Sequence, residues 1–302
     1  MKHLIIINPK AGVKDSSEKL INELSKVFKE EEYEYYLTQG VKDATSYVKD
    51  YLNNYQDEVV RIYACGGDGT LNEVVNGAYG YSNAEVTCYP NGSGNDFLKS
   101  LGKLDVFSNF ENLKNGSIHE VDLIKFNDHF VLNIFNVGLD AKVVVKHAKI
   151  KKWPLVSGKM AYNLGLVSAF FGKIRDKYKL VVDGEVLFEG RGMLCAIANG
   201  ICYGGGYYCA PNASVEDGEL DICLVKNISR IKFLDMVGDY KKGNHLTKPK
   251  VFKHIVYAKG KKVHLEVENE LPYSVDGEIG YSKSVDLEIV PRAIKFVVPS
   301  EV

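Results

Sequence analysis

The sequence lacks the features of a membrane-spanning, exported or nucleic-acid-binding chain. Its longest apolar stretch beyond the amino terminus, LGLVSAFFG at residues 164–172, falls well short of the roughly 20 residues that a membrane-spanning helix needs. The amino-terminal run HLIIIN is too short for the apolar core of a signal peptide, so we expect a cytoplasmic protein. The formal net charge of −1 argues against a chain built as a whole to bind nucleic acid.

The cysteines also lack a pattern. No Cys-x-x-Cys pair is present, which argues against a zinc site or a disulfide framework. They lie in strand-like or glycine-rich segments, so we predict reduced, buried thiols. The six residues are Cys65, Cys88, Cys195, Cys202, Cys209 and Cys223.

The pattern of the sequence changes near Asp122. Before it, buried strands such as VVRIYAC at 59–65 alternate with helical segments, which predicts a parallel sheet with ligands beyond the carboxyl ends of its strands. After it, β-rich runs with few helical signals predict a mostly antiparallel sandwich, with hairpin turns at Asn127-Asp128 and Asp183-Gly184. We therefore predict an α/β domain over 1–124, completed by 291–302, and a β-sandwich domain over 125–290.

A glycine-rich turn follows the strand at 59–65. In GGDGTLNEVVNG at 66–77, the residues after the glycines have the spacing of a helix. Glycines let the backbone approach an anion closely, and the amides and dipole of a helix amino terminus favour phosphate there. The spacing is neither that of a Walker A loop nor that of G-x-G-x-x-G, so it predicts a phosphate site of another kind.

Six motifs in order carry a resemblance that covers essentially the whole chain. They are NPKAG at 8–12, GGDGTLNEVVNG at 66–77, PNGSGNDF at 90–97, VDLIKFN at 121–127, GGGYYCAPNASVEDGELDI at 204–222 and VDGE at 275–278. Together they resemble the bacterial diacylglycerol kinase-like lipid kinases, relatives of the eukaryotic diacylglycerol and sphingosine kinases. The resemblance implies an α/β nucleotide-binding domain of the phosphofructokinase and NAD kinase type, a β-sandwich lipid-substrate domain, and an active site in the cleft between them.

The resemblance also implies ATP as the phosphate donor. Two positions depart from the family, because Lys10-Ala11 stand where a small or hydroxyl residue is usual, and Ser93 stands where threonine is usual. Serine keeps the hydroxyl, so we expect that phosphate contact to persist, whereas Ala11 leaves one side-chain contact open. The implied ATP contacts are Asn8, Pro9, Lys10, Ala11, Gly12, Thr38, Gly66, Gly67, Asp68, Gly69, Thr70, Leu71, Asn72 and Ser93.

The tripeptide DGE occurs three times, with different flanks. The first copy, at 183–185, lies between two alternating runs and predicts a structural hairpin turn. The second, at 217–219, resembles the structural magnesium loop of the family, with Mg²⁺ held by oxygens of Ser214, Asp217 and Glu219. An exposed Asp-Gly turn is the alternative for this copy.

The third copy, at 276–278, corresponds by the resemblance to the catalytic carboxylate. Phosphoryl transfer needs a group that accepts or orients the hydroxyl proton, and metal to offset the phosphate charge. We predict Asp276 and Glu278 as the catalytic pair, with Asp68 opposite, and the residues leave open which of the pair takes the proton. The alternatives are a hairpin turn for Asp276 and a helix cap for Asp68.

A basic segment predicts where a lipid kinase would meet its substrate. Residues 142–179 hold ten Lys or Arg side chains against the single acid Asp176, interleaved with aromatic residues such as Trp153. Such a segment suits the headgroups of an anionic membrane, and the alternative is an ordinary solvated face. An exposed edge strand of the second domain could pair two subunits in a homodimer.

The predicted function is an ATP- and Mg²⁺-dependent lipid kinase, with diacylglycerol as the default acceptor, acting transiently at the inner face of the membrane. Two alternatives stay open. One is a kinase of the NAD kinase type with a soluble substrate, and the other is a catalytically silent nucleotide-binding regulator.

Overall fold

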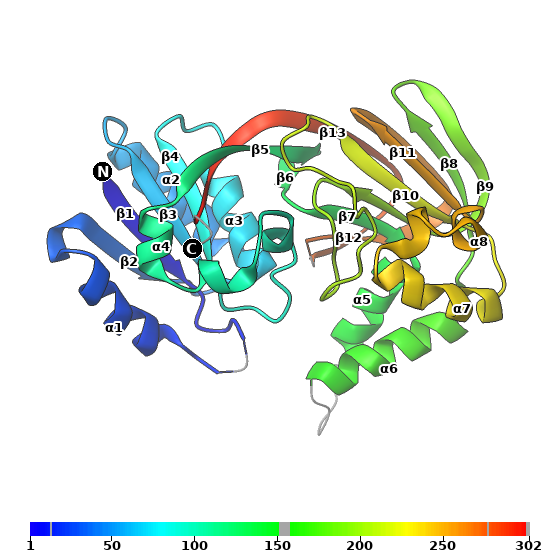
Figure 1. Cartoon of the computed structure of the whole chain (residues 1–302), viewed down its shortest axis with the longest axis horizontal. Helices are drawn as coiled ribbons and strands as arrows, with labels where there is room; N and C mark the ends of the chain where they lie inside the picture. Colours follow the sequence, from blue (N-terminus) through cyan, green and yellow to red (C-terminus); the bar gives the residue numbers. More distant parts are fainter. Residues whose placement is uncertain (13, 151–157, 277, 300–302) are drawn as a thin grey trace. The chain divides into compact units, whose positions relative to one another are not determined.

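The computed structural model describes residues 1–12, 14–150, 158–276 and 278–299, without the side chains of 158–163 and 166. The chain divides into two compact units (Figure 1). The first unit comprises Met1–Leu123, Val215–Gly218 and Val290–Val302, and the second comprises Ile124–Ser214 and Glu219–Ile289.

The first unit is built on a parallel sheet. Its strands follow the order β2-β1-β3-β4, and the carboxyl-terminal part of β13 then pairs with β4, also in parallel. Every residue of β3 is buried, and so is every residue of β1 beyond the first, as expected for strands covered on both faces. The strands are β1 (Lys2–Ile7), β2 (Tyr33–Leu37), β3 (Val60–Gly66), β4 (Ala84–Pro90) and β13 (Glu278–Val298).

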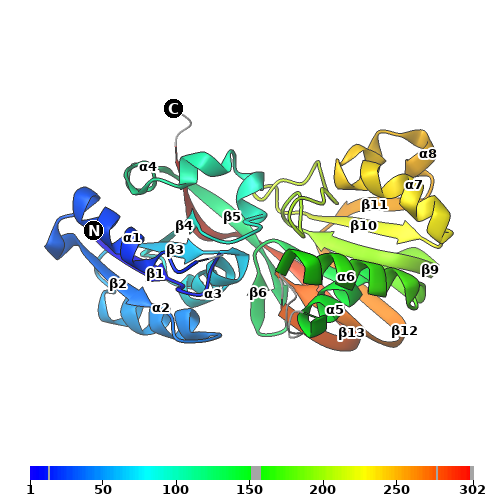
Figure 2. The ribbon, with the colours of Figure 1, turned by 90° about the horizontal axis from the view of Figure 1, so that it is seen from below.

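Helices cover both faces of this sheet. In both ribbon views α1 and α4 lie on one face and α2 and α3 on the other (Figures 1 and 2). Gly77 lets α2 and α3 approach closely, since a Cβ there would lie 2.8 Å from the Cβ of Val48. The helical elements are α1 (Ser17–Val27), η1 (Glu30–Glu32), α2 (Asp43–Asn54), α3 (Asp68–Ala78), η2 (Phe97–Ser100), η3 (Leu104–Phe107) and α4 (Phe110–Lys114).

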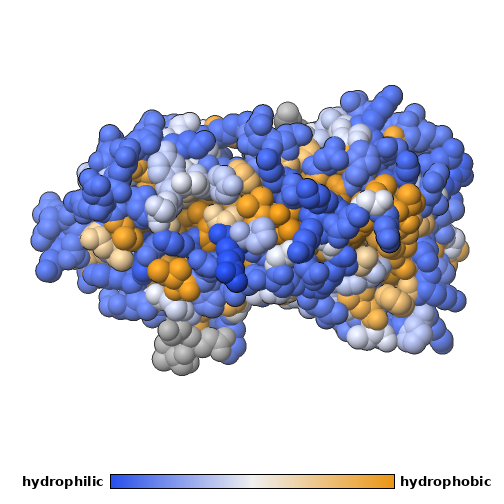
Figure 3. All heavy atoms as spheres, turned by 90° about the horizontal axis from the view of Figure 1, so that it is seen from above, coloured by the Kyte–Doolittle hydropathy of each residue, from blue (hydrophilic) through white to orange (hydrophobic). Residues whose placement is uncertain are grey.

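The second unit is antiparallel. Both β9 and β12 pair with β8 along one part of their length and with β7 along another, so the pairing of these strands closes on itself. Phe135, Leu180 and Leu265 belong to its buried apolar cluster, and Figure 3 shows further hydrophobic residues at the surface of this unit. The strands are β5 (Ser117–Phe126), which begins in the first unit, β6 (His129–Val131), β7 (Ile134–Gly138), β8 (Asp176–Val182), β9 (Glu185–Ala198), β10 (Leu220–Lys226), β11 (Ile255–Gly260), β12 (Lys262–Val275) and the first part of β13.

The second unit also contains helices that the sequence pattern did not predict. Helix α5 carries three consecutive valines at 143–145, and β-branched residues favour strands. Helix α6 has no charged residue between 160 and 171, so its sequence lacks the charged face by which a surface helix is usually identified. None of the helices in the described part of the chain is long and apolar enough to cross a membrane. The elements are α5 (Leu139–Ile150), α6 (Gly158–Phe171), α7 (Arg230–Lys241), η4 (Asn244–Leu246) and α8 (Pro249–Phe252).

The cysteines behave as predicted. All six are free and buried. Burial raises the pKa of the Cys195 thiol to about 12, so this thiol stays protonated near neutral pH.

Candidate active site

The predicted phosphate loop lies where the strand order reverses. Strand β1 has β2 on one side and β3 on the other, so the connections after β1 and after β2 run in opposite directions across the sheet. Parallel sheets bind ligands beyond the carboxyl ends of their strands at such a switch point. The loop at 8–12 follows β1, the turn at Gly67 follows β3, and the loop at 91–96 follows β4. Three of the predicted motifs therefore meet at one edge of the sheet.

Hydrogen bonds join the loops that follow β1 and β3. The amide of Asn8 donates to the carbonyl of Cys65 at 3.0 Å, and its side-chain nitrogen donates to the Thr70 hydroxyl at 2.9 Å. Thr38, at the end of β2, donates its amide to the Ile7 carbonyl at 2.9 Å. These bonds place Asn8, Thr38 and Thr70, all predicted ATP contacts, around the carboxyl end of β1.

Glycines allow the loops after β3 and β4 to pack closely. The amides of Asn91 and Gly92 donate to the Gly66 carbonyl at 2.8 and 3.1 Å. A Cβ on Gly12, which has a φ of 79°, would lie 2.7 Å from the Asn91 carbonyl oxygen. A Cβ on Gly66 would overlap Thr70, and one on Gly92 would overlap the backbone of Gly67. Backbone therefore lines this part of the site, as a phosphate cradle requires.

Helix α3 begins in this cradle. Its N-cap is Gly67, which has no side chain to bond the amides of the first turn, and an anion can take that place. Asp68 is the first residue of the helix, so it is not the cap that the alternative interpretation proposed.

Two carboxylates converge beside Gly94. A Cβ built on Gly94 would lie 3.1 Å from Oδ2 of Asp68 and 3.4 Å from Oδ2 of Asp96. Asp68 accepts a hydrogen bond from the Phe97 amide at 3.2 Å, and Asp96 forms an ion pair with Lys99 at 2.5 Å. Burial raises the pKa of Asp68, and the negative charge of Asp96 raises it further. A cation placed beside this pair would be favoured electrostatically.

The remaining predicted ATP contacts differ in exposure. Lys10, Gly69 and Ser93 are exposed beside the cradle, and Pro9 and Ala11 are partly buried. The side chain of Leu71 is only 1% exposed and packs in the core, so it cannot line the site as a side chain. Its amide donates to the Gly67 carbonyl at 3.0 Å, within the helix. Contact of Leu71 with ATP stays a prediction, and any such contact would involve its backbone.

The sequence reasoning overlooked Asn95. This residue has a φ of 47°, and its side-chain nitrogen donates to the Gly92 carbonyl at 3.0 Å. Its buried side-chain oxygen has no hydrogen-bond partner among the described residues. The signal available in the sequence was an asparagine between glycine and aspartate in GSGNDF, because asparagine tolerates the left-handed conformation.

The second DGE copy lies beside a buried aspartate. Asp122 is fully buried, and its carboxylate accepts the amides of Gly218 and Arg292, both at 2.7 Å. Burial raises the pKa of Asp122, and the negative charges of Asp217 and Glu216 contribute. Asp122 therefore fixes the acidic loop at 215–218 within the first unit through the Gly218 amide.

The three predicted magnesium ligands occupy different environments. Ser214 and Asp217 are exposed, whereas Glu219 is partly buried and forms an ion pair with Lys259 at 3.8 Å. No group of three His, Cys, Asp or Glu residues in the described ranges is arranged to hold a metal. A site at Asp217 would therefore combine one carboxylate with hydroxyl, carbonyl or water oxygens, which Mg²⁺ accepts.

The first DGE copy is a hairpin turn, which confirms that prediction. Val182 pairs with Glu185, and Asp183 and Gly184 form the two-residue loop between β8 and β9 with φ angles of 49° and 87°. The Asp183 carboxylate accepts the amides of Lys261 and Lys262, at 3.0 and 2.8 Å. Its role visible in the structure is to hold the neighbouring turn.

The third DGE copy is also in a hairpin. Val275 pairs with Glu278 across the turn between β12 and β13, and Asp276 has a φ of 43°. Gly277 lies outside the described residues. The turn that we considered as an alternative is therefore present, and it places the partly buried Asp276 and the exposed Glu278 at one end of the hairpin.

Three consecutive amides orient the Asp276 carboxylate. Its Oδ2 accepts the amides of Leu132 at 2.9 Å and Asn133 at 3.3 Å, and its Oδ1 accepts that of Ile134 at 3.1 Å. Leu132 and Asn133 join β6 to β7, and Ile134 is the first residue of β7. The carboxylate is thus held in one orientation by the backbone.

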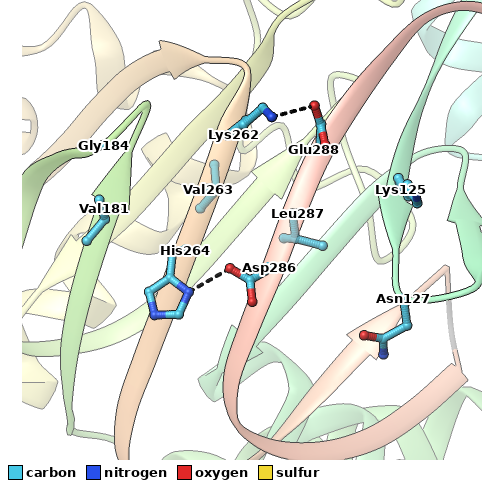
Figure 4. Close-up of a pocket in the computed structure, with 10 residues that line it drawn as sticks. All are labelled: Lys125, Asn127, Val181, Gly184, Lys262, Val263, His264, Asp286, Leu287 and Glu288. Atoms are coloured by element: carbon cyan, nitrogen blue, oxygen red, sulfur yellow. Dashed lines mark hydrogen bonds and ion pairs between the residues drawn. The ribbon is translucent and has the colours of Figure 1, made fainter.

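A hollow on the second unit contains none of the predicted site residues (Figure 4). Its charged groups largely pair across β12 and β13, with Lys262 3.0 Å from Glu288 and His264 2.7 Å from Asp286. We assign it no ligand. Its lining comprises Lys125, Asn127, Val181, Gly184, Lys262, Val263, His264, Asp286, Leu287 and Glu288.

The predicted basic segment is only partly described. Lys142 and Lys173 both pair with the buried Asp176, at 2.5 and 3.1 Å. Lys177 pairs with Glu268 at 2.9 Å. Lys151, Lys152 and Trp153 lie outside the described residues, as do the side chains of Lys159, Met160, Tyr162 and Leu166.

Two known protein families match this chain. The family described as the diacylglycerol kinase catalytic domain matches residues 2–126, and the family described as the YegS C-terminal NAD kinase beta sandwich-like domain matches residues 133–298. A Staphylococcus epidermidis protein named as a candidate lipid kinase is 30% identical over 274 residues, which cover 88% of this chain and 85% of that protein.

Solved structures share the fold. The crystal structure of a candidate diacylglycerol kinase from Bacillus anthracis superposes with a TM-score of 0.77 at 25% identity, covering 98% of this chain and 96% of that one. An NAD kinase from Archaeoglobus fulgidus, solved in complex with ATP, superposes with a TM-score of 0.52 at 13% identity, covering 99% and 94%. The predicted fold class is confirmed.

The fold and the glycine-lined cradle define a kinase-like protein with an α/β domain and a β-sandwich-like domain. Within that class, the chain belongs to the diacylglycerol kinase-like family of lipid kinases.

Proposed function

We propose that the protein transfers the γ-phosphate of ATP to a hydroxyl group of a lipid, with diacylglycerol as the first acceptor to test. The observation that carries the proposal is the cradle at the carboxyl ends of β1, β3 and β4, where backbone and the amino terminus of α3 lie beside Asp68 and Asp96. Family membership supports a lipid as the acceptor. The lipid acceptor implies peripheral contact with a membrane.

The cradle has the chemistry that a nucleotide triphosphate needs. Amides at the start of α3 would bind phosphate oxygens, and Thr70 and Ser93 would supply hydroxyl donors. Lys10 is exposed at the rim and would add positive charge. We expect ATP to bind here with its phosphates towards Gly67.

The residues present also fit Mg²⁺. The converging carboxylates of Asp68 and Asp96 would bind a hydrated ion near the phosphates, and Asp217 with Ser214 and Glu219 would hold a structural one. When bound, Mg²⁺ offsets negative charge on the phosphate oxygens.

The third DGE copy would handle the proton. Asp276 is oriented by three amides, so it suits the role of the base that accepts or orients the acceptor's hydroxyl proton. Glu278, exposed at the start of β13, would assist through water.

The test is transfer of labelled phosphate from ATP, with Mg²⁺, to diacylglycerol, phosphatidylglycerol, sphingosine and NAD in separate mixed-micelle assays. Transfer to a lipid supports the proposal and names the acceptor. Transfer to NAD alone would overturn it in favour of a soluble-substrate kinase. ATP binding without any transfer would favour the nucleotide-binding regulator.

A further inference from the structure

Helix α6 exposes an apolar face. Leu164, Val167 and Phe171 have the i, i+3, i+7 spacing of one helix face, and they are 41%, 53% and 74% exposed. Such a solvent-facing stripe on a globular protein normally carries charged residues. This face therefore differs from an ordinary solvated surface.

Helix α7 extends the apolar face. Ile231 and Leu234 are 82% and 59% exposed in its first turns. The guanidinium of Arg230 donates to the carbonyls of Phe170 at 3.0 Å and Gly172 at 2.8 Å, which ties the start of α7 to the end of α6. We call the five exposed side chains on the two helices the α6–α7 ridge; they are Leu164, Val167, Phe171, Ile231 and Leu234.

The two sequence segments that contain the ridge residues are strongly basic. Residues 142–179 contain ten Lys or Arg and one acid, and residues 226–254 contain eight Lys or Arg and two acids. The excess is therefore nine plus six, or +15, in a chain whose formal net charge is −1, so the rest carries −16. Positive charge is concentrated in the two segments that include α6 and α7.

The three acids in these segments are already paired. Asp176 pairs with Lys142 and Lys173, Asp235 pairs with Lys232 at 2.8 Å, and Asp239 pairs with Lys248 at 2.5 Å. Outside these segments, Glu268 pairs with Lys177 at 2.9 Å and Glu266 with Lys179 at 4.0 Å. The positive charge of the two segments still exceeds the negative charge of the acids that pair with it in the described part of the chain.

We propose that the α6–α7 ridge docks the protein on an anionic phospholipid bilayer. The surface of such a bilayer has charged phosphates above an apolar acyl layer. The exposed apolar side chains of the ridge would enter the acyl boundary, while cations of the two basic segments would meet the phosphates. A second copy of the chain is a poorer occupant, since ridge-to-ridge contact would bring two positive surfaces together. The inference rests on the proposed function, which requires a lipid acceptor.

The test is co-sedimentation of the full-length chain, without ATP, with vesicles of phosphatidylcholine and phosphatidylglycerol in equal parts. We expect the double variant Ile231→Ser, Leu234→Ser to lower partitioning by about tenfold or more, because two apolar side chains lose their burial. Phe171→Ser should lower it in the same direction. The matched control is Val186→Ser, an exposed apolar residue at the start of β9, which should leave partitioning unchanged.

The outcomes separate the docking surface from the chemistry. Equal partitioning of the ridge variants and the original chain would overturn the docking proposal, whatever the kinase assay shows. Equal binding to vesicles of phosphatidylcholine alone would also overturn it, because the anionic lipid would then be irrelevant.

A ridge-dependent dimer seen by sedimentation velocity, with unchanged vesicle binding, would assign the ridge to a second copy. Transfer to acceptor in detergent micelles should persist in the ridge variants, so its absence from all forms would count against the proposed function alone.

Discussion

Two hairpins in the second unit share the tripeptide DGE and the same local turn, yet they bind different partners. In both, the aspartate takes a left-handed conformation, with φ angles of 49° at Asp183 and 43° at Asp276. Asp183 is exposed and holds the turn at 261–262, whereas Asp276 is partly buried and holds the segment that leads into β7. The comparison teaches that a local motif determines its turn, while its role depends on the segment that the carboxylate orients.

The sharpest test of this comparison exchanges each aspartate for asparagine, which tolerates the left-handed turn. We expect Asp276→Asn to lower turnover by about 10² to 10⁴, the usual contribution of a general base, while ATP still binds. Asp183→Asn, its matched control, should change turnover by no more than about twofold, because asparagine keeps an acceptor oxygen for the neighbouring amides. Steady-state transfer and ATP titration measure both effects, and inactivation by Asp183→Asn instead would reverse the assignment.

Asp68 extends the comparison to a carboxylate outside any hairpin. We expect Asp68→Asn to lower turnover by about 10² while ATP remains bound, since one charge that would favour the metal is lost. The raised pKa of Asp68 means that it is protonated at a higher pH than an ordinary aspartate, so activity should fall as the pH decreases through that raised value.

Asp96 supplies the control for that pH dependence. Removing its negative charge in Asp96→Asn should lower the pKa of Asp68 and move the acidic limb of the rate profile to lower pH. If the acidic limb of the rate profile stayed at the same pH in Asp96→Asn, the pKa of Asp68 would not determine that limb.

The second DGE copy is expected to show a smaller effect. Asp217→Asn should lower turnover by about tenfold, because lost metal support typically costs that much, and added Mg²⁺ should restore part of the rate. The measurement is turnover against Mg²⁺ concentration, with Glu216→Gln on the same loop as the control. An unchanged Mg²⁺ dependence would make this copy a simple turn.

The smallest expected effect concerns stability near β7. Asp140 follows that strand and accepts a hydrogen bond from the Tyr203 hydroxyl, and burial raises the pKa of Asp140 to about 6. Because the folded pKa is higher than the unfolded one, its contribution is fully present below the unfolded pKa of 3.8 and is lost as the pH rises through 6. Between these values the free energy of unfolding should fall by about 2 kcal/mol from this group. Urea unfolding at a series of pH values checks this, and Asp140→Asn should remove that part of the dependence.

Local pattern predicted the first unit better than the second. In the first unit, the spacing of apolar residues distinguished strands from helices, and their alternation along the chain indicated a parallel sheet. In the second unit the pattern missed α5 and α6, since the valines at 143–145 favour a strand and α6 lacks a polar face. Packing against the sheet and against each other overrides those preferences.

The candidate site shows the same division. GGDGT indicated a phosphate cradle, because glycine and a helix amino terminus are local requirements. The sequence did not indicate that Gly92 packs on Gly67, or that Asp68 and Asp96 converge beside Gly94. Those contacts join segments that follow different strands, so they depend on the order of strands in the sheet.

The amino-acid sequence by itself therefore determined the phosphate turn, the two-residue turn at Asp183-Gly184 and the family to which the chain belongs. Tertiary structure alone decided which amides each aspartate binds, and it turned the apolar face of α6 towards solvent. The physical reason is distance along the chain. A turn depends on the φ angles of adjacent residues, whereas the bond from Leu132 to Asp276 joins residues 144 positions apart.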